Sequence, residues 1–457
     1  MTFTSWQFVA FVTAVFSLYY LPPLRRFQVH ILVVASLIFY GAGQTQLLPL
    51  LGLAVFGTYC FLALTLRDHR WLSMGIIFNL GLLAFFKYKF LFTDFSSLSS
   101  SDVGVVDFLL KLPLPIGISF FVFHNISLLI DLTKSKTSVA LPNVLLYIIF
   151  FPQLVSGPIT RAGKFLPQIQ PKFLAAIPFI DSAKWIISGY FFKLFVANNL
   201  NQMTIHMDVP LYETLKSADR WLLVVLYSFQ IYADFLGYSS IAVGLALLFG
   251  YRLPINFNLP YISTSFAEFW TRWHISLSTW LRTYLYIPLG GNRLGQVRTY
   301  LNLMVVMGLG GLWHGAAFGY LAWGLLHGMF LVIERPFLSR VNLASRNNGW
   351  NYLITTLRLA TVFVCVSLAW VLFKLPDFEH ALRFLSGMFD EQHIAQPARI
   401  YRSLALIYAF PVILQHLAPR QWYGNWHERL EPYLYGTMAA LMLVEAGPET
   451  SFIYFQF

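Results

Sequence analysis

Two histidines of this chain lie in or beside long apolar runs, where an ionisable side chain is costly. Residues 307–316 read MGLGGLWHGA, and His314 follows Trp313 inside this run. His274 lies in a second stretch, EFWTRWHISLSTWLRTYLYIPLGGNR, at residues 268–293. A polar side chain at membrane depth indicates a functional site. A neutral imidazole could take a proton from a hydroxyl, carry protons in a transporter, or bind a metal.

Two kinds of site lack the residues that usually accompany them. A metal site needs at least three ligands, and the chain has no tight His, Asp or Glu cluster such as H-E-x-x-H. The serine-hydrolase elbow G-x-S-x-G is also absent. The two cysteines, Cys60 and Cys365, lie in apolar stretches and can form neither a disulfide framework nor a zinc pattern. The residues therefore indicate a histidine-centred polar site without a metal.

Further polar residues lie in these apolar stretches. Asp234, in YADFLGYSSIA, either is satisfied by an arginine or a backbone amide, or lines a polar cavity. Asn302 precedes His314, and His327 follows it by thirteen positions. On one unbroken helix the two histidines would point about 220° apart and lie roughly 20 Å apart along the axis, so they could not share a site. The glycines around His314 would let a backbone or a ligand approach closely; they are Gly310, Gly311 and Gly315.

Membrane helices are the elements that must position these residues. The chain has 457 residues, of which 57% are hydrophobic, 18% aromatic and only 11% charged, against about 25% charged in soluble proteins. Its mean hydropathy is +0.62. This apolar surface has to face lipid, so we expect an all-α polytopic bundle that forms one membrane-embedded domain over residues 1–457. The net charge of +11 indicates cytoplasmic loops rather than nucleic-acid binding.

The apolar spans give a predicted topology. The first 26 residues end in a basic pair and read as a membrane helix rather than a signal peptide, with Arg25 and Arg26 inside. Segment 91–110 has no lysine or arginine and is expected outside. We expect roughly 11 to 13 membrane-spanning or re-entrant helices. Later spans are predicted near 29–42, 46–65, 71–90, 115–132, 141–156, 221–250, 299–334, 352–374, 402–417 and 432–446. The 299–334 span is too long for one crossing and should break at its glycines.

Segment 268–287 is predicted to form one amphipathic helix that lies at the interface or along a cavity wall. Glu268 and Arg272 would pair at i and i+4, and the helix would end at Pro288. One face would carry Trp270, Trp273, His274, Leu277 and Trp280, and the other Arg272, Ser276, Thr279 and Thr283.

At these residues the chain resembles the membrane-bound O-acyltransferase family, and most of all its bacterial branch that includes the alginate O-acetylation membrane subunit. The similarity runs from about residue 25 to the end, with core motifs at 112–334. The matching blocks occur in order: LPLPIGISFFVFH (112–124), FPQLVSGPITRAGKFLPQI (151–169), GLALLFGYRLPINFNLPY (244–261), the 268–293 stretch, LNLMVVMGLGGLWHGAAF (301–318), WVLFKLPDFEHALRFLSGMF (370–389) and the terminal FIYFQF.

The resemblance implies helices around a central tunnel and the transfer of acyl groups to hydroxyls. His314 would be the signature histidine, acting as general base, and His274 the second family histidine. The donor would be cytoplasmic, such as acetyl-CoA, with no bound cofactor. The acceptor would be an extracytoplasmic polysaccharide of the alginate or cellulose type, or a periplasmic partner protein that completes the transfer. The chain would lie in the bacterial inner membrane.

The same blocks supply candidate substrate-binding residues: Trp313, Asn302, Arg272, Trp273, Arg282, Tyr284, Asp234 and Tyr238. Arg272, Arg282, Arg293 and Arg298 could bind donor phosphates or simply follow the positive-inside bias. Ser240 and Thr283 stand where the family pattern has Asp, which leaves the acceptor open. Peptidoglycan or teichoic-acid acylation by the same chemistry is an alternative, and a flippase for a glycan or lipid intermediate is an alternative of another class.

Overall fold

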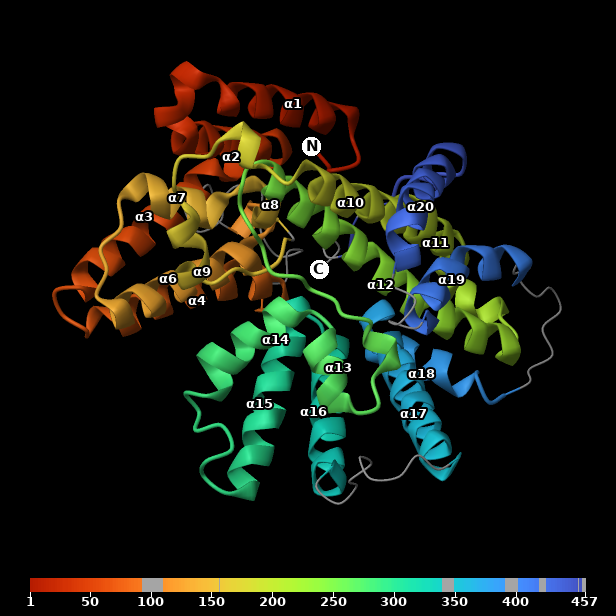
Figure 1. Ribbon diagram of the computed structural model, residues 1–457. Coiled ribbons are helices and arrows are strands. Elements are labelled where there is room, and N and C mark those ends of the chain that lie inside the picture. The colour runs from red at the N-terminus through yellow and green to blue at the C-terminus, as the bar shows by residue number, and fades with distance from the viewer. Residues whose placement is uncertain are drawn as a thin grey trace, which may run out of the picture. The chain divides into compact units, whose positions relative to one another are not determined.

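In the computed structural model, the described part of the chain comprises residues 1–92, 110–155, 157–338, 349–390, 402–418, 425–450 and 452–453 (Figure 1). Every regular element in these residues is helical, as the hydropathy pattern predicts. Most of the predicted outer segment 91–110 and most of the terminal FIYFQF block lie outside the described residues.

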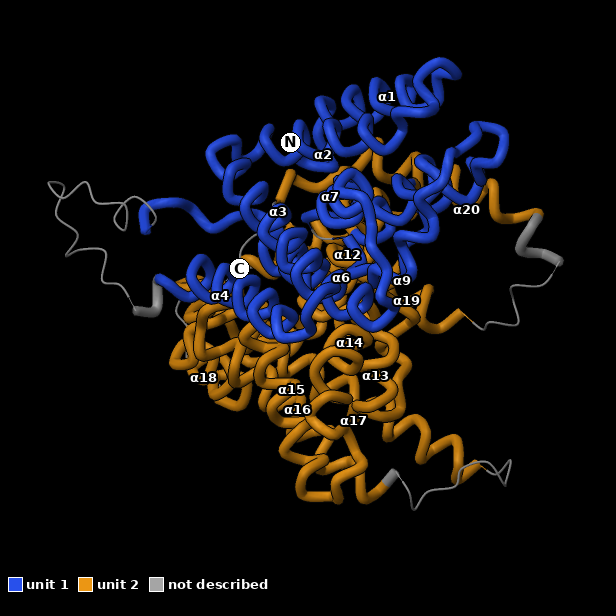
Figure 2. The backbone as a smooth tube through the Cα atoms, turned by 90° about the vertical axis from the view of Figure 1, so that its left-hand side faces the viewer, with its two compact units in different colours: residues 1–186, 239–254 blue, residues 187–238, 255–457 orange. Residues whose placement is uncertain are grey.

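The chain divides into two compact units (Figure 2). Unit 1 comprises residues 1–186 and 239–254, and unit 2 comprises residues 187–238 and 255–457. Two long helices, α10 (Phe179–Tyr190) and α12 (Ser217–Leu248), contribute residues to both units. The prediction of one membrane-embedded domain over the whole chain stays a prediction.

Unit 1 is held together by a buried polar network between three of its helices. The Asn79 side chain donates to the Thr58 hydroxyl at 3.0 Å and accepts from the Asn125 amide at 2.7 Å. Such bonds are favourable inside an apolar bundle, because the alternative is an unsatisfied polar group. The helices of unit 1, besides parts of α10 and α12, are α1 (Trp6–Tyr20), α2 (Gln28–Gln44), α3 (Leu48–Thr65), α4 (Trp71–Phe92), α6 (Ile118–Ser135), α7 (Leu141–Ile149), α8 (Phe151–Leu154) and α9 (Ala162–Phe165).

Unit 2 contains the histidine-bearing stretches. A π-helical turn at Phe191–Ala197 follows α10, and the antiparallel pair α15 and α16 packs beside α17 (Figure 1). The helices of unit 2, besides parts of α10 and α12, are α11 (Asn198–Thr204), α13 (Phe266–Arg272), α14 (Ile275–Leu281), α15 (Gln296–His314), α16 (Phe318–Leu338), α17 (Gly349–Lys374), α18 (Phe378–Ser386), α19 (Arg402–Leu417) and α20 (Asn425–Val444).

Four stretches of the described chain are long and apolar enough to cross a membrane. They are Pro22–Thr65, Trp71–Lys89, Ser217–Leu248 and Gly349–Lys374. α1 and α19 are apolar but shorter. The predicted 141–156 span is broken after Ile149 and continues as the short helix α8. The structure therefore combines helices long enough to cross a membrane with shorter, interrupted helices.

Candidate active site

The hairpin formed by α15 and α16 positions His314. The chain leaves the helical conformation after His314 and re-enters it at Phe318, so the predicted break in the 299–334 span is confirmed. The two helices meet at glycines: a Cβ on Gly311 would lie 2.2 Å from the Tyr320 carbonyl oxygen, and one on Gly324 would lie 2.3 Å from that of Met307. The glycines thus serve the close approach of two backbones.

His314 is the last residue of α15 and is only 4% exposed. Three aromatic rings surround its imidazole, with centroid distances of 5.0 Å to Trp313, 5.2 Å to Trp323 and 5.1 Å to Phe373. Trp323 comes from α16 and Phe373 from α17. The carbonyl end of α15 carries a partial negative charge that would stabilise a positive imidazolium by about 0.3–1 kcal/mol.

His274 lies at a break between two short helices, so the prediction of one helix over 268–287 is wrong. α13 ends at Arg272, α14 begins at Ile275, and His274 adopts a left-handed conformation with φ 42°. The cause is tertiary. The Asn258 N–H donates to the Arg272 carbonyl at 3.0 Å, the Ile275 N–H to the Asn256 carbonyl at 3.0 Å, and the Ser276 N–H to the Asn256 side chain at 3.3 Å. These bonds replace those of a continuous helix.

The break directs the His274 ring inward. His274 is fully buried, and its ring meets Phe235 of α12 edge-on at 4.6 Å. It also lies 5.9 Å from the Trp313 ring, which itself contacts His314. The structure therefore brings His274, Trp313 and His314 together, although they come from separate sequence blocks.

His327 lies closer to His314 than a single helix would allow. Because α15 and α16 are antiparallel, both histidines pack on the indole of Trp323, at 5.2 Å for His314 and 4.9 Å for His327. The inference that the two could not share a site therefore fails. His327 is fully buried, and neither ring nitrogen has a hydrogen-bond partner among the described residues. Its partners are aromatic, among them Trp270 at 5.2 Å.

Asp234 combines the two roles that its sequence context left open. Its carboxylate accepts from the Lys193 ammonium at 2.6 Å and from the backbone N–H of Ile453 at 2.9 Å. Both charged side chains are almost fully buried, and Asp234 also lines a cavity. The backbone amide that the sequence context suggested is that of Ile453, whereas the counter-ion is Lys193 and not the expected arginine. The signal was present, because Lys193 stands alone in the apolar run YFFKLFVA.

Two other candidate residues, Tyr238 and Trp273, belong to aromatic walls. The Tyr238 ring stacks on Phe452 with a centroid distance of 4.3 Å. Trp273 is fully buried, stacks on Phe269 and lies 4.9 Å from Trp370. Phe452 also lies 5.9 Å from Phe235, the ring that meets His274 edge-on.

Asn302, Tyr284 and Arg282 are three further candidates from the sequence. Asn302 donates to the carbonyls of Leu289 and Gly291 at 3.2 and 3.0 Å and so holds the turn before α15. Tyr284 packs on Trp280 at 5.2 Å, and Arg282 is exposed.

Arg272 forms the predicted pair with Glu268, at 2.8 Å, and donates to the Asn258 carbonyl. Burial alone would raise the pKa of Glu268, but hydrogen bonds from the Thr264 N–H and from Arg272 bring that pKa below its usual value. The carboxylate therefore stays ionised and holds Arg272 in place.

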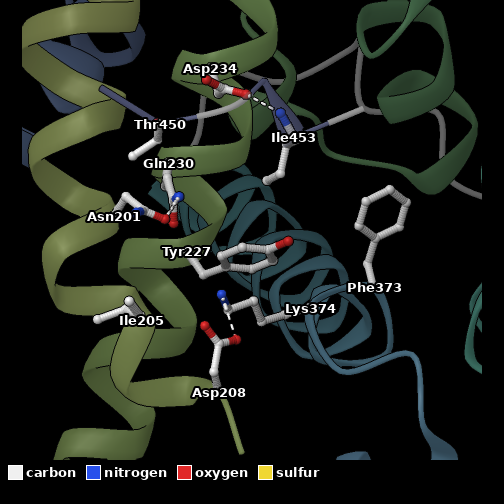
Figure 3. A pocket seen from close by; sticks show the side chains of 10 residues that line it. All are labelled: Asn201, Ile205, Asp208, Tyr227, Gln230, Asp234, Phe373, Lys374, Thr450 and Ile453. Carbon is white, nitrogen blue, oxygen red and sulfur yellow. Dashed lines mark hydrogen bonds and ion pairs between the residues drawn. The ribbon is translucent and has the colours of Figure 1, made fainter. Parts of the chain in front are cut away.

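A polar cavity of about 230 Å³ lies inside unit 2 (Figure 3). Helix α12 contributes Tyr227, Gln230 and Asp234, which lie on one face of that helix. An ion pair of 2.7 Å joins Lys374 to Asp208 at one end of the cavity, and the Asp234–Ile453 bond lies at the other end (Figure 3). Phe373, which touches His314, is also part of the lining.

The described chain thus combines long apolar helices with a buried, aromatic-lined pair of histidines in unit 2, which is the arrangement expected of a membrane-embedded protein with a polar site. The family profile described as MBOAT, membrane-bound O-acyltransferase family, matches residues 37–373. The chain belongs to this family. It is a multi-pass membrane O-acyltransferase, as the sequence blocks predict.

Curated relatives point to O-acetylation. The chain is 38% identical to the probable alginate O-acetylase AlgI of Pseudomonas syringae pv. tomato, over 85% of this chain and 75% of the relative. It is 36% identical to the peptidoglycan O-acetyltransferase of Helicobacter pylori, over 78% of this chain and 73% of the relative. It is 29% identical to the teichoic acid D-alanyltransferase of Bacillus subtilis, over 58% of this chain and 70% of the relative. The chain is thus an AlgI-like O-acetylase of this family.

Proposed function

We propose that the protein transfers an acetyl group from a cytoplasmic thioester donor such as acetyl-CoA to a hydroxyl on the other side of the membrane, with His314 as general base. The observation that carries this proposal is the place of His314 at the end of α15, buried among three aromatic rings and joined to His274 through Trp313. A positioned base of this kind contributes about 10²–10⁴-fold to a rate.

The chemical step uses groups that this arrangement holds. The acceptor oxygen forms a bond to the acyl carbonyl carbon while its proton moves to the His314 imidazole. The tetrahedral intermediate then collapses, the bond to the donor sulfur breaks, and the departing thiolate receives the proton from His314. Trp313 and His274 are our candidates to stabilise the oxyanion, because their rings lie next to one another and Trp313 touches His314.

The two reactants reach the site from opposite sides in this proposal. Acetyl-CoA is large and charged, so only its acyl end has to enter a tunnel through the bundle. Arg293 and Arg298 are exposed near the start of α15, far from His314 along the helix, and could attract the donor phosphates. Arg272 is less suited, because Glu268 already neutralises it.

The acceptor we favour is an exopolysaccharide of the alginate or cellulose type, reached directly or through a periplasmic partner protein, with the chain in the bacterial inner membrane. The relatives at 38% identity that are named as probable alginate O-acetylases support this choice. The peptidoglycan O-acetyltransferase at 36% identity supports a second candidate, acetylation of peptidoglycan by the same chemistry.

His314→Gln tests the proposal in proteoliposomes that contain the full chain. Labelled acetyl-CoA is supplied on the cytoplasmic side of the protein, and alginate, cellulose or peptidoglycan fragments are supplied as acceptors on the other side. We expect acetyl transfer to fall by about 10²–10⁴-fold, because glutamine cannot accept the proton. His69→Gln is the matched control, because His69 is exposed in the loop before α4. Full transfer by His314→Gln at equal protein content would refute the proposal. Movement of a glycan without covalent change would indicate a flippase instead.

A further inference from the structure

We propose that a hollow on the surface of unit 1 binds the phosphate headgroup of an anionic phospholipid. The hollow has a volume of about 460 Å³ and is lined by Pro22, Pro23, Arg25, Arg26 and Pro171, which all belong to unit 1. Sites for small ligands typically enclose ~300–1,000 Å³. The lining shares no residue with the site of acetyl transfer, so a lipid here would be an additional ligand.

Two segments of the chain form the hollow, and a buried glutamine ties them together. One is the 3-10 turn Pro22–Phe27, which precedes α2, and the other contains Pro171 and Lys172. The Gln28 side chain is only 5% exposed, donates to the Lys172 carbonyl at 3.0 Å and accepts from the Lys172 N–H at 2.8 Å. The prolines also restrict the backbone of both segments. The hollow is therefore preformed, which lowers the entropic cost of binding.

Both arginines of the hollow lie over aromatic rings. The Arg25 Cζ lies 4.4 Å from the centroid of the Phe173 ring, and the Arg26 Cζ lies 4.8 Å from that of Phe27. Such a contact uses the flat face of a guanidinium and leaves its N–H edge available to a phosphate. Neither arginine has an ion-pair or hydrogen-bonding side-chain partner in the described part of the chain. The hollow therefore presents two positioned cations to an anion.

The surroundings of the hollow favour a lipid over a free anion. Four apolar side chains beside it are 41–52% exposed, namely Leu21, Phe27, Phe173 and Leu174. The turn also begins the apolar stretch Pro22–Thr65, which is long enough to cross a membrane. The end of such a stretch is expected at the depth of the lipid headgroups. Acyl chains can cover the apolar side chains there while the phosphate meets the arginines.

The charges of the hollow select an anionic headgroup over a zwitterionic one. The amine of phosphatidylethanolamine would meet two guanidinium groups, and none of the lining residues carries a carboxylate to pair with it. Phosphatidylglycerol keeps its negative charge and adds only neutral hydroxyls. The cytoplasmic leaflet, where the positive-inside bias puts Arg25 and Arg26, is also where anionic lipids attract basic residues.

Native mass spectrometry of the full-length protein in detergent tests the proposal, with the dissociation constant of the first bound lipid as the readout. The unmodified protein should bind phosphatidylglycerol roughly tenfold more tightly than phosphatidylethanolamine with the same acyl chains. The double variant Arg25→Gln, Arg26→Gln should weaken binding of phosphatidylglycerol roughly 10- to 100-fold. Lys134→Gln, Lys136→Gln is the matched control, because these lysines are exposed at the end of α6 in the same unit and carry the same charge. It should change binding less than twofold.

A second variant tests the role of the aromatic ring without removing a charge. Phe173→Leu should weaken binding of phosphatidylglycerol several-fold, because leucine cannot hold the Arg25 guanidinium, and its exposed position makes misfolding no concern. Phe179→Leu, at a ring that is 45% exposed and outside the lining, is its control and should have no effect.

Four results would overturn the proposal. Equal binding of the two lipids would remove the headgroup preference, and an equal loss in the lysine variant would reduce the effect to general positive charge. Displacement of phosphatidylglycerol by equimolar glycerol 1-phosphate would indicate a site for free phosphate compounds. Displacement by equimolar coenzyme A would instead assign the hollow to the phosphates of the acyl donor.

Discussion

The two histidines that pack on the Trp323 indole differ in what surrounds them. His314 lies at a helix end beside Trp313 and near the lining of the polar cavity, whereas His327 lies wholly among aromatic rings without a hydrogen-bond partner in the described residues. A buried polar atom that stays unpaired costs about 1–3 kcal/mol. Both histidines contact Trp323. Substituting each one separately can therefore distinguish a chemical role for His314 from a packing role for His327.

His327→Phe should stabilise the protein by about 1–3 kcal/mol and leave acetyl transfer within a few-fold of the unmodified chain. The phenyl ring keeps the packing on Trp323 and Trp270 and removes two unpaired nitrogens. Thermal unfolding in detergent and the proteoliposome assay measure the two effects. His314→Phe is the matched variant and should abolish transfer. A stable but inactive His327→Phe protein would show that His327 takes part in the chemistry.

For single residues, the sequence predicted which side chains belong to the candidate site better than it predicted which side chains contact each other. His314, His274 and Asp234 stand out because polar groups in apolar runs are rare and costly. The shared contact of His314 and His327 with Trp323 could not be predicted from helical spacing, because it depends on a chain reversal between them. Lys193 was detectable by the same criterion as Asp234, but its partner at 2.6 Å lies 41 positions away.

The pairing of α15 with α16 depends on a glycine in each helix. Gly324→Ala should separate the two helices, because the new methyl group would lie 2.3 Å from the Met307 carbonyl oxygen in the opposite backbone. Overpacking of this kind costs typically 1–3 kcal/mol or more, and it would also shift His314 from Trp323. We expect a lower unfolding temperature and a loss of transfer larger than the stability change alone explains.

Gly81→Ala in α4 is the control for this substitution. A Cβ at Gly81 meets nothing within 4 Å, so alanine should be neutral or stabilise the helix by up to ~1 kcal/mol. If Gly324→Ala behaved like Gly81→Ala in unfolding and in activity, the close crossing would not be needed to position the histidine.

Hydropathy predicted where the long helices lie, but it did not predict where a helix is interrupted. The long spans over α3, α12 and α17 were predicted close to their ends, because the apolar length needed to cross a membrane is fixed. Segment 268–287 was predicted as one helix because its aromatic residues have helical spacing. It is broken at His274 because the Ile275 and Ser276 N–H groups donate to Asn256, and the Asn258 N–H donates to the Arg272 carbonyl. Helical spacing within the segment carries no information about such bonds to other segments.

Across the whole molecule, a buried ion pair joins distant parts of the chain in unit 2. Lys193 lies in the π-helical turn and Asp234 in α12, and the pair also binds the segment after α20 through Thr450 and Ile453. Gly237 permits this approach, because a Cβ there would lie 2.8 Å from the backbone nitrogen of Lys193. The ion pair therefore connects the π-helical turn, α12 and the segment after α20.

Lys193→Met should destabilise the protein by about 3–5 kcal/mol, because it leaves the Asp234 carboxylate buried without its counter-ion. The double variant Lys193→Met, Asp234→Asn should recover much of this loss, since the asparagine oxygen can still accept from the Ile453 N–H. Unfolding temperatures of the two variants in the same detergent provide the measurement. A double variant no more stable than Lys193→Met would show that the pair acts through something other than its charge balance.

The bond between Asp234 and Ile453 also sets an order of events during biosynthesis. Its two residues are 219 positions apart, so at 5–20 residues per second roughly ten to forty seconds separate their emergence from the ribosome. During that interval the nascent α12 can pair with Lys193, which is already made, but not with the backbone that later covers Asp234. Nonsense or frameshift mutations beyond Glu445 would consequently act as lesions of the core, and the unfinished bundle would be a natural client for membrane quality control.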